Sequence, residues 1–582
     1  MYRPVLDAVA GSLTLTALVA LLPLVVLFVM LGVLRISAWK ASLVSLIVSI
    51  LVAIIAYSMP VGQAVMSGLE GAAFGFFPIL WIVINAIWLY NMTVVTGHFD
   101  VLRRSFARVS DDQRIQAVII AFCFGALLEA LAGFGTPVAI TSVMLIALGF
   151  RPLKAAVVAL VANTAPVAFG ALAVPITTLA TVSGIPEHTL SQMVGRQTPI
   201  LGIFVPMALV YIIDRGRGVR ATLPATLTAG IAFALAQFAT SNYLSTQLTD
   251  IVASLVGAAA VVLLLRVWRP ATPYIESEEA DLEEREAVHV SRRAARTEDQ
   301  VASGVPAGHA GGTDHPIDAG VGTAEEYAAR DRAHVDTRSD VVKAYAPYII
   351  IIIIFSLSQL PGIKDALAAP GGQFKWPGLD LQTASGKPST IPVFKLNWLS
   401  AAGTLMLIAG LVSIPVIGIS VGKAARAYLD TLRQLLPAII TVMAVLGLAY
   451  VMNASGQTAS LGLWMAGAGS AFAIISPVLG WLGVAVTGSD TSSNSLFGAL
   501  QVSAANQVGL SKVLMAAANS SGGVLGKMIS PQNLAIAAAA VGLSGREGDI
   551  FRRIIGWSLG FLVFMCVLVY LQSTPVLSWM VP

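Results

Sequence analysis

Long apolar segments recur along almost the whole chain, with short polar stretches between them. A run of about 18 or more apolar residues is long enough for a membrane-spanning helix. A transmembrane β-barrel would instead show short segments of alternating polarity. The pattern predicts an all-α polytopic membrane protein with about 12 transmembrane helices, at residues 13–34, 38–59, 71–96, 151–183, 199–214, 222–240, 247–268, 346–360, 397–418, 436–453, 512–540 and 554–572.

Two further apolar stretches, 115–148 and 476–507, are interrupted by Gly, Pro and Ser at their centres. We predict that both are re-entrant hairpins, which enter and leave the membrane on the same side. With the N-terminus outside, this topology places most loop Lys and Arg residues in the cytoplasm, as the positive-inside rule requires. If 115–148 spanned the membrane, its two flanking basic clusters would lie on opposite sides.

The composition agrees with a chain that lies in a lipid bilayer. Of all residues, 56% are hydrophobic and 11% are charged, whereas soluble domains carry about a quarter charged residues. Segment 270–345 differs, because it is acidic and lacks apolar periodicity, so we predict a disordered cytoplasmic linker. The basic residues elsewhere are scattered over short loops, which argues against a nucleic-acid partner.

Two distant segments resemble each other and predict an inverted-topology repeat. At one constant offset, Ala162, Asn163, Gly170 and Pro175 match Ala518, Asn519, Gly526 and Pro531. Each match lies in an apolar run that follows a hairpin and is broken by Gly or Pro. A helix break in lipid costs several kcal/mol per unpaired backbone group, so it is tolerated where it lines a cavity. Paired breaks of this kind mark the binding site of many secondary transporters.

These observations divide the chain into four parts. We predict a first repeat at 1–214, with hairpin 115–148 and broken helix 151–183. Connecting helices follow at 215–269, and then the linker at 270–345. The second repeat is predicted at 346–582, with hairpin 476–507 and broken helix 512–540.

Of the 31 Asp and Glu residues, we place Glu129 and Asp490 in the membrane interior, at the centres of the two hairpins. An acid there costs about 2.5–3.5 kcal/mol on insertion scales, so it is a functional candidate. A carboxyl that changes protonation near neutral pH could carry a coupling proton. Alternatively, each acid caps a half-helix or pairs with a structural base.

Lys527 is the base that we place in the interior. It could neutralise the carboxylate of a substrate, form a standing ion pair with Asp490 or Glu129, or extend to the interface. Backbone N–H groups at helix N-termini favour anions. The further substrate-binding candidates therefore lie at the hairpin tips and the helix breaks: Gly133, Phe134, Gly135, Thr136, Asn163, Thr164, Ser489, Thr491, Ser492, Ser493, Asn494, Asn519, Ser520 and Ser521.

The same polar groups would also suit Na⁺, so the residues leave open whether H⁺ or Na⁺ is the coupling ion. We find no Walker-type nucleotide loop and no hydrolase, redox or metal-binding pattern in the sequence, so we expect neither an enzyme nor a cofactor. The two cysteines lie in apolar stretches, where packing is their expected role.

Five strings in the membrane part resemble the L-lactate permease family. They are GFGTPVAI (133–140), NTAPVAFGA (163–171), MVGRQ (193–197), TGSDTSSNSLF (487–497) and GGVLGKMISPQN (522–533). The resemblance implies a bacterial inner-membrane protein that imports L-lactate, with D-lactate and glycolate as further substrates, by proton symport. It also implies an elevator-type mechanism. A homodimer is compatible with this plan.

On this reading, Lys527 and the hairpin tips hold the carboxylate of a small monocarboxylate, and Asn163 or Asn519 holds its hydroxyl group. The main alternative is a sodium-coupled carboxylate transporter of the same architecture. A substrate with two or three carboxylates would require more cations than one lysine, which argues against di- and tricarboxylates. An anion channel is a second alternative.

Overall fold

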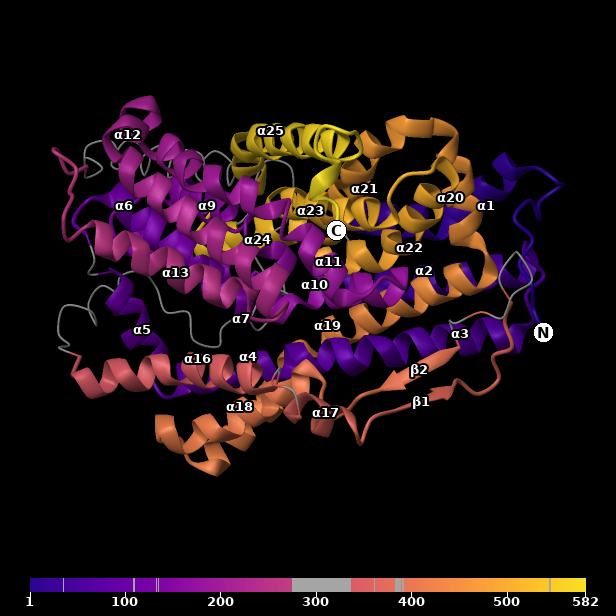
Figure 1. Cartoon of the computed structure of the whole chain (residues 1–582), viewed down its shortest axis with the longest axis horizontal. Helices are drawn as coiled ribbons and strands as arrows, with labels where there is room; N and C mark the ends of the chain where they lie inside the picture. The colour runs from indigo at the N-terminus through magenta and orange to yellow at the C-terminus, as the bar shows by residue number, and fades with distance from the viewer. Residues whose placement is uncertain are drawn as a thin grey trace, which may run out of the picture.

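The computed structural model is almost entirely helical (Figure 1). It describes residues 1–34, 36–107, 110–131, 133, 135–274, 336–358, 360, 362–382, 389, 392–543 and 546–582. Within these residues, nine helices are long and apolar enough to cross a membrane, and one bent pair raises the number to ten. The predicted all-α polytopic architecture is therefore confirmed, whereas the number of 12 spans stays a prediction.

The N-terminal half consists of helices with short connections. They are α1 (Leu13–Phe28), η1 (Val29–Val33), α2 (Ala38–Ile55), α3 (Val61–Phe74), η2 (Gly75–Leu80), α4 (Trp81–Val95), α5 (His98–Ala107), α6 (Gln113–Ala117), η3 (Val118–Phe124), α7 (Gly125–Leu131), α8 (Thr136–Ala147), α9 (Pro152–Ala162), η4 (Val167–Phe169), α10 (Gly170–Ser183), α11 (Glu187–Val194), α12 (Thr198–Ala239), η5 (Thr240–Leu244) and α13 (Thr249–Leu264).

The C-terminal half adds one small antiparallel hairpin, in which Gly372 pairs with Leu396. Its elements are α16 (Arg338–Ser358), α17 (Ile363–Ala368), β1 (Gly372–Lys375), β2 (Val393–Leu396), α18 (Ala402–Ile417), α19 (Val421–Ser455), α20 (Gln457–Met465), η6 (Ala466–Ala471), α21 (Phe472–Thr487), α22 (Asp490–Val508), α23 (Lys512–Gly526), η7 (Lys527–Ile529), α24 (Pro531–Ala540), α25 (Glu547–Gln572) and η8 (Ser578–Met580).

Several predicted span boundaries were wrong. The span predicted at 71–96 begins ten residues earlier, because α3, η2 and α4 follow one another without a loop and only Phe77 is non-helical. The spans at 199–214 and 222–240, by contrast, match two helical segments of α12, which fold back on each other at Asp214 and Arg215, since a methyl group on Gly230 would collide with the backbone carbonyl of Ile203. The span at 436–453 belongs to a helix of 35 residues, α19. These helices begin or end in polar residues, so the apolar segment in the sequence is shorter than the helix.

The predicted linker is helical in its last residues. Helix α16 begins at Arg338, where Asp340 accepts a hydrogen bond from the backbone N–H of Thr337 at 3.0 Å. Asp336 accepts two hydrogen bonds from Arg104 of α5, at 2.9 and 2.6 Å. The rest of the linker prediction, 275–335, lies outside the described residues.

Each half contains a helical hairpin followed by a broken helix. The first hairpin comprises α6, η3, α7 and α8, and the first broken helix comprises α9 and α10, which are bent by 65°. The second hairpin comprises α21 and α22, and the second broken helix comprises α23 and α24. The two halves contact each other reciprocally, since α8 packs against α24 and α10 packs against α22.

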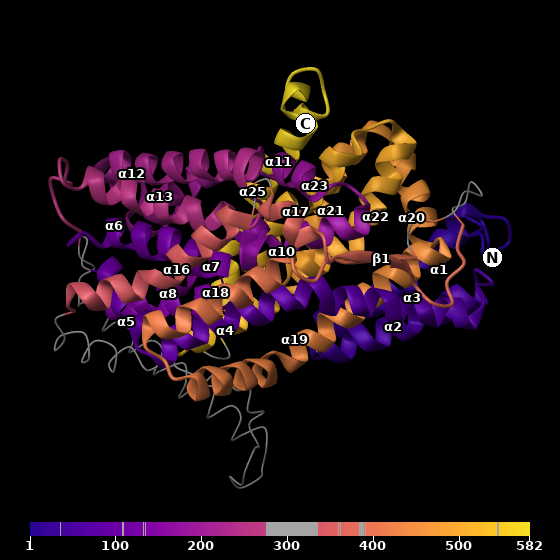
Figure 2. The same cartoon turned by 60° about the horizontal axis from the view of Figure 1, so that its bottom comes forward.

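The long helices α3, α4 and α19 run along one side of the molecule, and α10, α22 and α23 occupy its middle (Figures 1 and 2). The two hairpin tips and the two helix breaks are therefore brought together inside the bundle.

Candidate functional site

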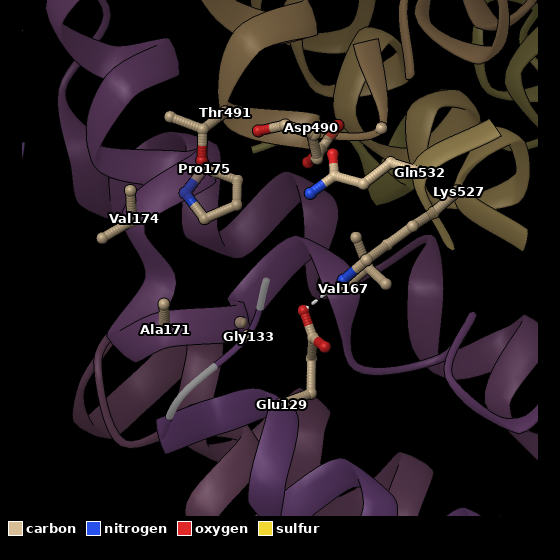
Figure 3. A pocket seen from close by; sticks show the side chains of 13 residues that line it. Glu129, Gly133, Val167, Ala171, Val174, Pro175, Asp490, Thr491, Lys527 and Gln532 are labelled. Carbon is tan, nitrogen blue, oxygen red and sulfur yellow. Dashed lines mark hydrogen bonds and ion pairs between the residues drawn. The ribbon is translucent and has the colours of Figure 1, made fainter. Parts of the chain in front are cut away.

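A cavity of about 50 Å³ lies between the hairpin tips and the helix breaks (Figure 3). One water molecule needs about 10–15 Å³, so the space accepts a solute equivalent to roughly three to five waters. Residues of both halves line it: Glu129, Gly133, Val167, Gly170, Ala171, Val174, Pro175, Gly488, Ser489, Asp490, Thr491, Lys527 and Gln532.

An ion pair between the two halves forms one wall of the cavity. The Nζ atom of Lys527 lies 2.5 Å from Oε1 of Glu129, and both side chains are buried. The second carboxylate oxygen, Oε2, accepts a hydrogen bond from Nδ2 of Asn163 at 3.0 Å. A methyl group on Gly170 would lie 2.8 Å from Oε1 of Glu129, so glycine is required for this approach. Of the alternatives for Lys527, the structure shows the pair with Glu129.

Asp490 lies across the cavity from Glu129, with Gln532 between them in Figure 3. It is the first residue of α22, and the N-cap is Ser489, whose hydroxyl accepts from the backbone N–H of Ser492. One carboxylate oxygen of Asp490 accepts hydrogen bonds from Ser520 at 2.6 Å and from Asn494 at 3.3 Å. The other oxygen, Oδ1, has no hydrogen-bond partner among the described residues.

A chain of amides supports Asp490 from behind. Asn494 accepts from Nδ2 of Asn519 at 2.9 Å, and Asn519 accepts from Gln501 at 3.1 Å. Asn494 also donates to the backbone carbonyl of Pro175 in α10, at 3.1 Å. Because buried polar groups are costly when unpaired, this network fixes the second hairpin against both broken helices.

The first helix break contains a strained turn. Ala171, Leu172 and Ala173 have φ values of 45°, 58° and 60°, which is the left-handed region. This conformation costs an L-residue about 1–2 kcal/mol. Strain of this kind persists where surrounding structure imposes it and is frequent at functional sites. Ala171 lines the cavity, so the strained backbone forms part of the candidate site.

The predicted site residues fall into three groups. Glu129, Asp490, Gly133, Ser489, Thr491 and Lys527 line the cavity. Asn163, Asn494, Asn519 and Ser520 lie behind it and bind lining residues or one another. The remaining described residues bond elsewhere or form local structure: Gly135, Thr136, Thr164, Ser492, Ser493 and Ser521. Phe134 lies outside the described residues.

The placement of Asn519, Ser520 and Ser521 at a helix break was wrong. They lie inside the continuous helix α23, and the break follows at Lys527–Ser530. The glycines of this helix serve close packing, because a methyl group on Gly522 would collide with the backbone carbonyl of Pro477 in α21. Small residues at helix interfaces have this role in membranes.

Sequence reasoning missed seven lining residues: Val167, Gly170, Ala171, Val174, Pro175, Gly488 and Gln532. Gly170 and Pro175 belong to the repeated positions, so that signal could have identified them. Two fully buried carboxyls were also missed, Glu70 in α3 and Asp250 in α13. Both lie at the margin of a predicted span, which is why they were not counted as interior.

The described residues contain no group of three or more His, Cys, Asp or Glu side chains that could hold a metal ion. The chemistry that the cavity offers is thus that of one ammonium group, two carboxyls, two hydroxyls and one amide. Such a set can bind a small anion and exchange a proton with it.

Comparison with known proteins agrees with the resemblance carried by the sequence strings. The family model for L-lactate permease matches residues 16–307 and 315–576. The chain belongs to the L-lactate permease family. An L-lactate permease of Bacillus subtilis is 40% identical over 99% of this chain and 98% of its own length. A glycolate permease of Escherichia coli is 41% identical over 98% of this chain and 97% of its own length.

A more distant L-lactate permease family member, from Halalkalibacterium halodurans, is 31% identical over 96% of this chain. Membership of the L-lactate permease family makes this chain a multi-pass bacterial membrane transporter and not an enzyme. Two solved transporters are weakly similar in structure. YdaH of Alcanivorax borkumensis has a TM-score of 0.41 at 16% identity, over 87% of this chain and 86% of that one. MtrF of Neisseria gonorrhoeae has 0.49 at 12%, over 94% and 97%.

Proposed function

We propose that this protein imports L-lactate, and also D-lactate and glycolate, by symport with protons. The observation that carries the proposal is the buried ion pair between Lys527 and Glu129 at the cavity wall. Relatives named L-lactate permease and glycolate permease support the substrate class. Both names denote small 2-hydroxy monocarboxylates, which suit a cavity with one cation and several neutral polar groups.

The ion pair suggests how lactate and a proton are coupled. An unpaired buried charge costs several kcal/mol, so Lys527 requires an anion at all times. In the empty site this anion is Glu129. When Glu129 takes up a proton, Lys527 is free to bind the carboxylate of lactate. The empty ion pair and the site loaded with lactate and a proton then carry the same net charge. The site that holds only the proton and the site that holds only lactate each contain an unpaired charge, so both are disfavoured.

The other groups of the cavity orient the substrate. Asn163 and Asn519, which we expected to hold the lactate hydroxyl, are hydrogen-bonded to Glu129 and to Asn494. The hydroxyl group is better served by Gln532 and Thr491, which line the cavity. Asp490 acts as a positioning residue, because its hydrogen bonds to Ser520 and Asn494 hold the second hairpin tip against α23.

The architecture supports an alternating-access proposal. In this proposal the chain is an inverted repeat, both hairpins are re-entrant, and the hairpins and broken helices move together as a transport unit. The helices before each hairpin form the scaffold. The reciprocal contacts of α8 with α24 and of α10 with α22 support one compact unit. Movement of a unit that carries its site across the membrane is the elevator mechanism.

Uptake of labelled lactate into proteoliposomes tests the function. A gradient of one pH unit is worth about 1.36 kcal/mol per proton and should support roughly tenfold accumulation at one proton per lactate. The gradient should act without Na⁺, and an uncoupler should abolish accumulation. Uptake that requires Na⁺ and ignores the uncoupler would exclude proton coupling.

Variants then separate coupling from binding. Glu129→Gln resembles the protonated carboxyl, so it should retain lactate–lactate exchange and lose accumulation. Asp490→Asn should weaken exchange and accumulation together, because it alters the position of the hairpin tip. Normal accumulation by Glu129→Gln would contradict the role of Glu129. Glu547→Gln at the start of α25, away from the cavity-lining residues, is the matched control.

A further inference from the structure

Asp250 is a buried carboxyl that the proposed transport step does not use. It lies in the first turn of α13 and is fully buried. Its Oδ1 atom accepts a hydrogen bond from Nε2 of Gln237 in α12, at 2.7 Å. Its Oδ2 atom has no partner within the described part of the chain. An isolated buried carboxylate is very costly, so this position favours a carboxyl that can hold a proton.

The packing of α13 brings Asp250 level with Glu129. Helix α13 contacts both η3 and α7, and a methyl group on Gly257 would lie 3.6 Å from the sulfur of Cys123. Glu129 lies six residues after Cys123, and Asp250 lies seven residues before Gly257. At about 1.5 Å per residue, antiparallel helices place both carboxyls at a similar height. The two carboxyls also interact electrostatically.

A third carboxyl, that of Glu187, lies at the partly exposed start of α11. Gln247, three residues before Asp250, donates from Nε2 to Oε1 of Glu187 at 2.6 Å. Glu187 begins α11 and is partly exposed. The positive-inside topology places this end of α13 on the outer side. The three carboxyls Glu187, Asp250 and Glu129 thus follow one another from a partly exposed position to the cavity.

We propose that Asp250 relays the coupling proton between Glu129 and the outer end of α13. The proposal rests on the proposed proton symport. In one transfer, the O–H bond of the Asp250 carboxyl breaks and a new O–H bond forms on Glu129, which releases Lys527 for lactate. Asp250 is then ionised and regains a proton from the Glu187 side. The N–H of Gln237 stabilises the ionised form, because hydrogen bonds to charged groups are the stronger ones.

The surroundings of Asp250 leave Glu129 as its titratable neighbour. The elements packed against α13 are α12, η5, η3, α7 and α10. Among the described residues of these elements, the charged groups are Glu129 in α7 and a cluster at the turn of α12: Asp214, Arg215, Arg217 and Arg220. That cluster precedes Gln237 by more than four helical turns.

The test uses Asp250→Asn, which keeps an oxygen for Gln237 and removes the proton. Purified protein in proteoliposomes is assayed for lactate–lactate exchange at equal pH and for proton influx with a dye trapped inside the vesicles. Exchange needs no net proton movement and should stay within about twofold of wild type. Net lactate–proton influx should fall by at least about tenfold, equivalent to 1.4 kcal/mol in a rate-limiting barrier. Asp250→Glu should restore influx.

Two control variants distinguish relay from packing. Gln237→Met removes the hydrogen bond that stabilises ionised Asp250 and keeps the carboxyl, so proton influx should fall much less than in Asp250→Asn. Glu70→Gln removes a different buried carboxyl, in α3, whose oxygens have no partner among the described residues. It should leave the coupling ratio unchanged. If Gln237→Met lost proton influx as severely as Asp250→Asn, packing would explain both defects and the relay would be excluded.

Other outcomes are equally decisive. Wild-type proton influx by Asp250→Asn would overturn the relay and leave the symport proposal standing. Absence of proton influx in wild type would instead refute the symport itself. If Asp250→Asn does not fold, Asp250→Glu carries the test, because its longer side chain should shift the pH profile of net influx and not that of exchange. An unshifted profile would overturn the relay.

Discussion

Lys527 connects parts of the chain that are far apart in sequence. Its partner Glu129 lies 398 residues away, on the other half of the molecule. Both side chains are buried, so neither charge is compensated by water. We therefore expect the pair to affect stability as well as the proposed transport step, and these two roles can be measured separately.

We expect Lys527→Met to destabilise the protein. Removing one partner of a buried ion pair costs about 3–5 kcal/mol, because the other charge stays buried and unpaired. Adding Glu129→Gln removes that charge and should recover most of the loss, since neutral replacements of buried pairs are often tolerated. The measurement is the thermal unfolding midpoint of the purified protein in detergent.

Lys512→Met provides the control for this experiment, because Lys512 is an exposed residue at the start of the same helix, α23. Its midpoint should match wild type. A double variant no more stable than Lys527→Met alone would show that the ion pair does not contribute to folding in the way described.

The sequence was sufficient to predict the charged residues of the cavity, but not which acid forms the ion pair with Lys527. Charge in an apolar chain is rare enough to be conspicuous, so Glu129, Asp490 and Lys527 could be identified. Which acid pairs with Lys527 depends on how the first hairpin packs against the second broken helix, and no local pattern encodes that. Gln532 was missed for a simpler reason, since a neutral amide beside a helix start is common in any sequence.

At the scale of helices, Asn494 shows how neighbouring elements are held together. It connects α22 with α23 through Asn519, with α10 through the carbonyl of Pro175, and with Asp490 in its own first turn. Three elements of the proposed transport unit thus meet at one amide. The network positions the tip of the second hairpin beside the cavity.

Asn494→Ala should lower the thermal unfolding midpoint and weaken lactate binding together. The substitution leaves the side-chain N–H groups of Asn519 without this partner and removes the bond between α22 and the carbonyl of Pro175. A buried unsatisfied group costs about 1–3 kcal/mol. Ser495→Ala is the matched control, because the Ser495 hydroxyl donates to the carbonyl of Thr491 within the same helix. If both variants had the same midpoint, the amide network would contribute no inter-helix stability.

At the scale of single elements, the clusters of Gly, Pro and Ser correctly predicted where the helices of each hairpin are interrupted. Gly135 and Gly488 have φ values of 84° and 75°, which glycine adopts without strain. The same reasoning failed in α23, where the glycines permit close packing against α21 and the helix continues. Composition alone does not distinguish a glycine that breaks a helix from one that lets two helices approach.

The whole molecule combines two halves with the same order of elements. In each half, long helices precede a hairpin and a broken helix. The repeated residues indicated this order in the sequence, because four identities share one offset. The reciprocal contacts between halves could not be predicted, since they depend on how two hairpins of similar composition meet in space. Span number was also hard to predict, because several helices are kinked or joined without a loop.

Cross-linking can test whether the hairpins move relative to the helices before them. Phe28 at the end of α1 and Phe497 in α22 have ring centroids 6.2 Å apart. They lie on opposite sides of the proposed boundary between scaffold and transport unit. In a Phe28→Cys, Phe497→Cys variant, a short cleavable bifunctional maleimide should reduce lactate exchange by at least about tenfold. Reduction of the linker should restore exchange.

The control pair is Phe74→Cys with Phe394→Cys, whose native rings are 4.5 Å apart in α3 and β2. Helix α3 precedes the first hairpin and strand β2 precedes the second hairpin, so both lie outside the proposed transport unit and their cross-link should be tolerated. Both variants also carry Cys123→Ala and Cys566→Ala, so that the reagent can join the introduced pair alone. Undiminished exchange after complete cross-linking of α1 to α22 would show that transport needs no movement at this boundary. A fixed scaffold and a mobile unit predict the opposite, because a site that carries its substrate across the membrane cannot stay attached to α1.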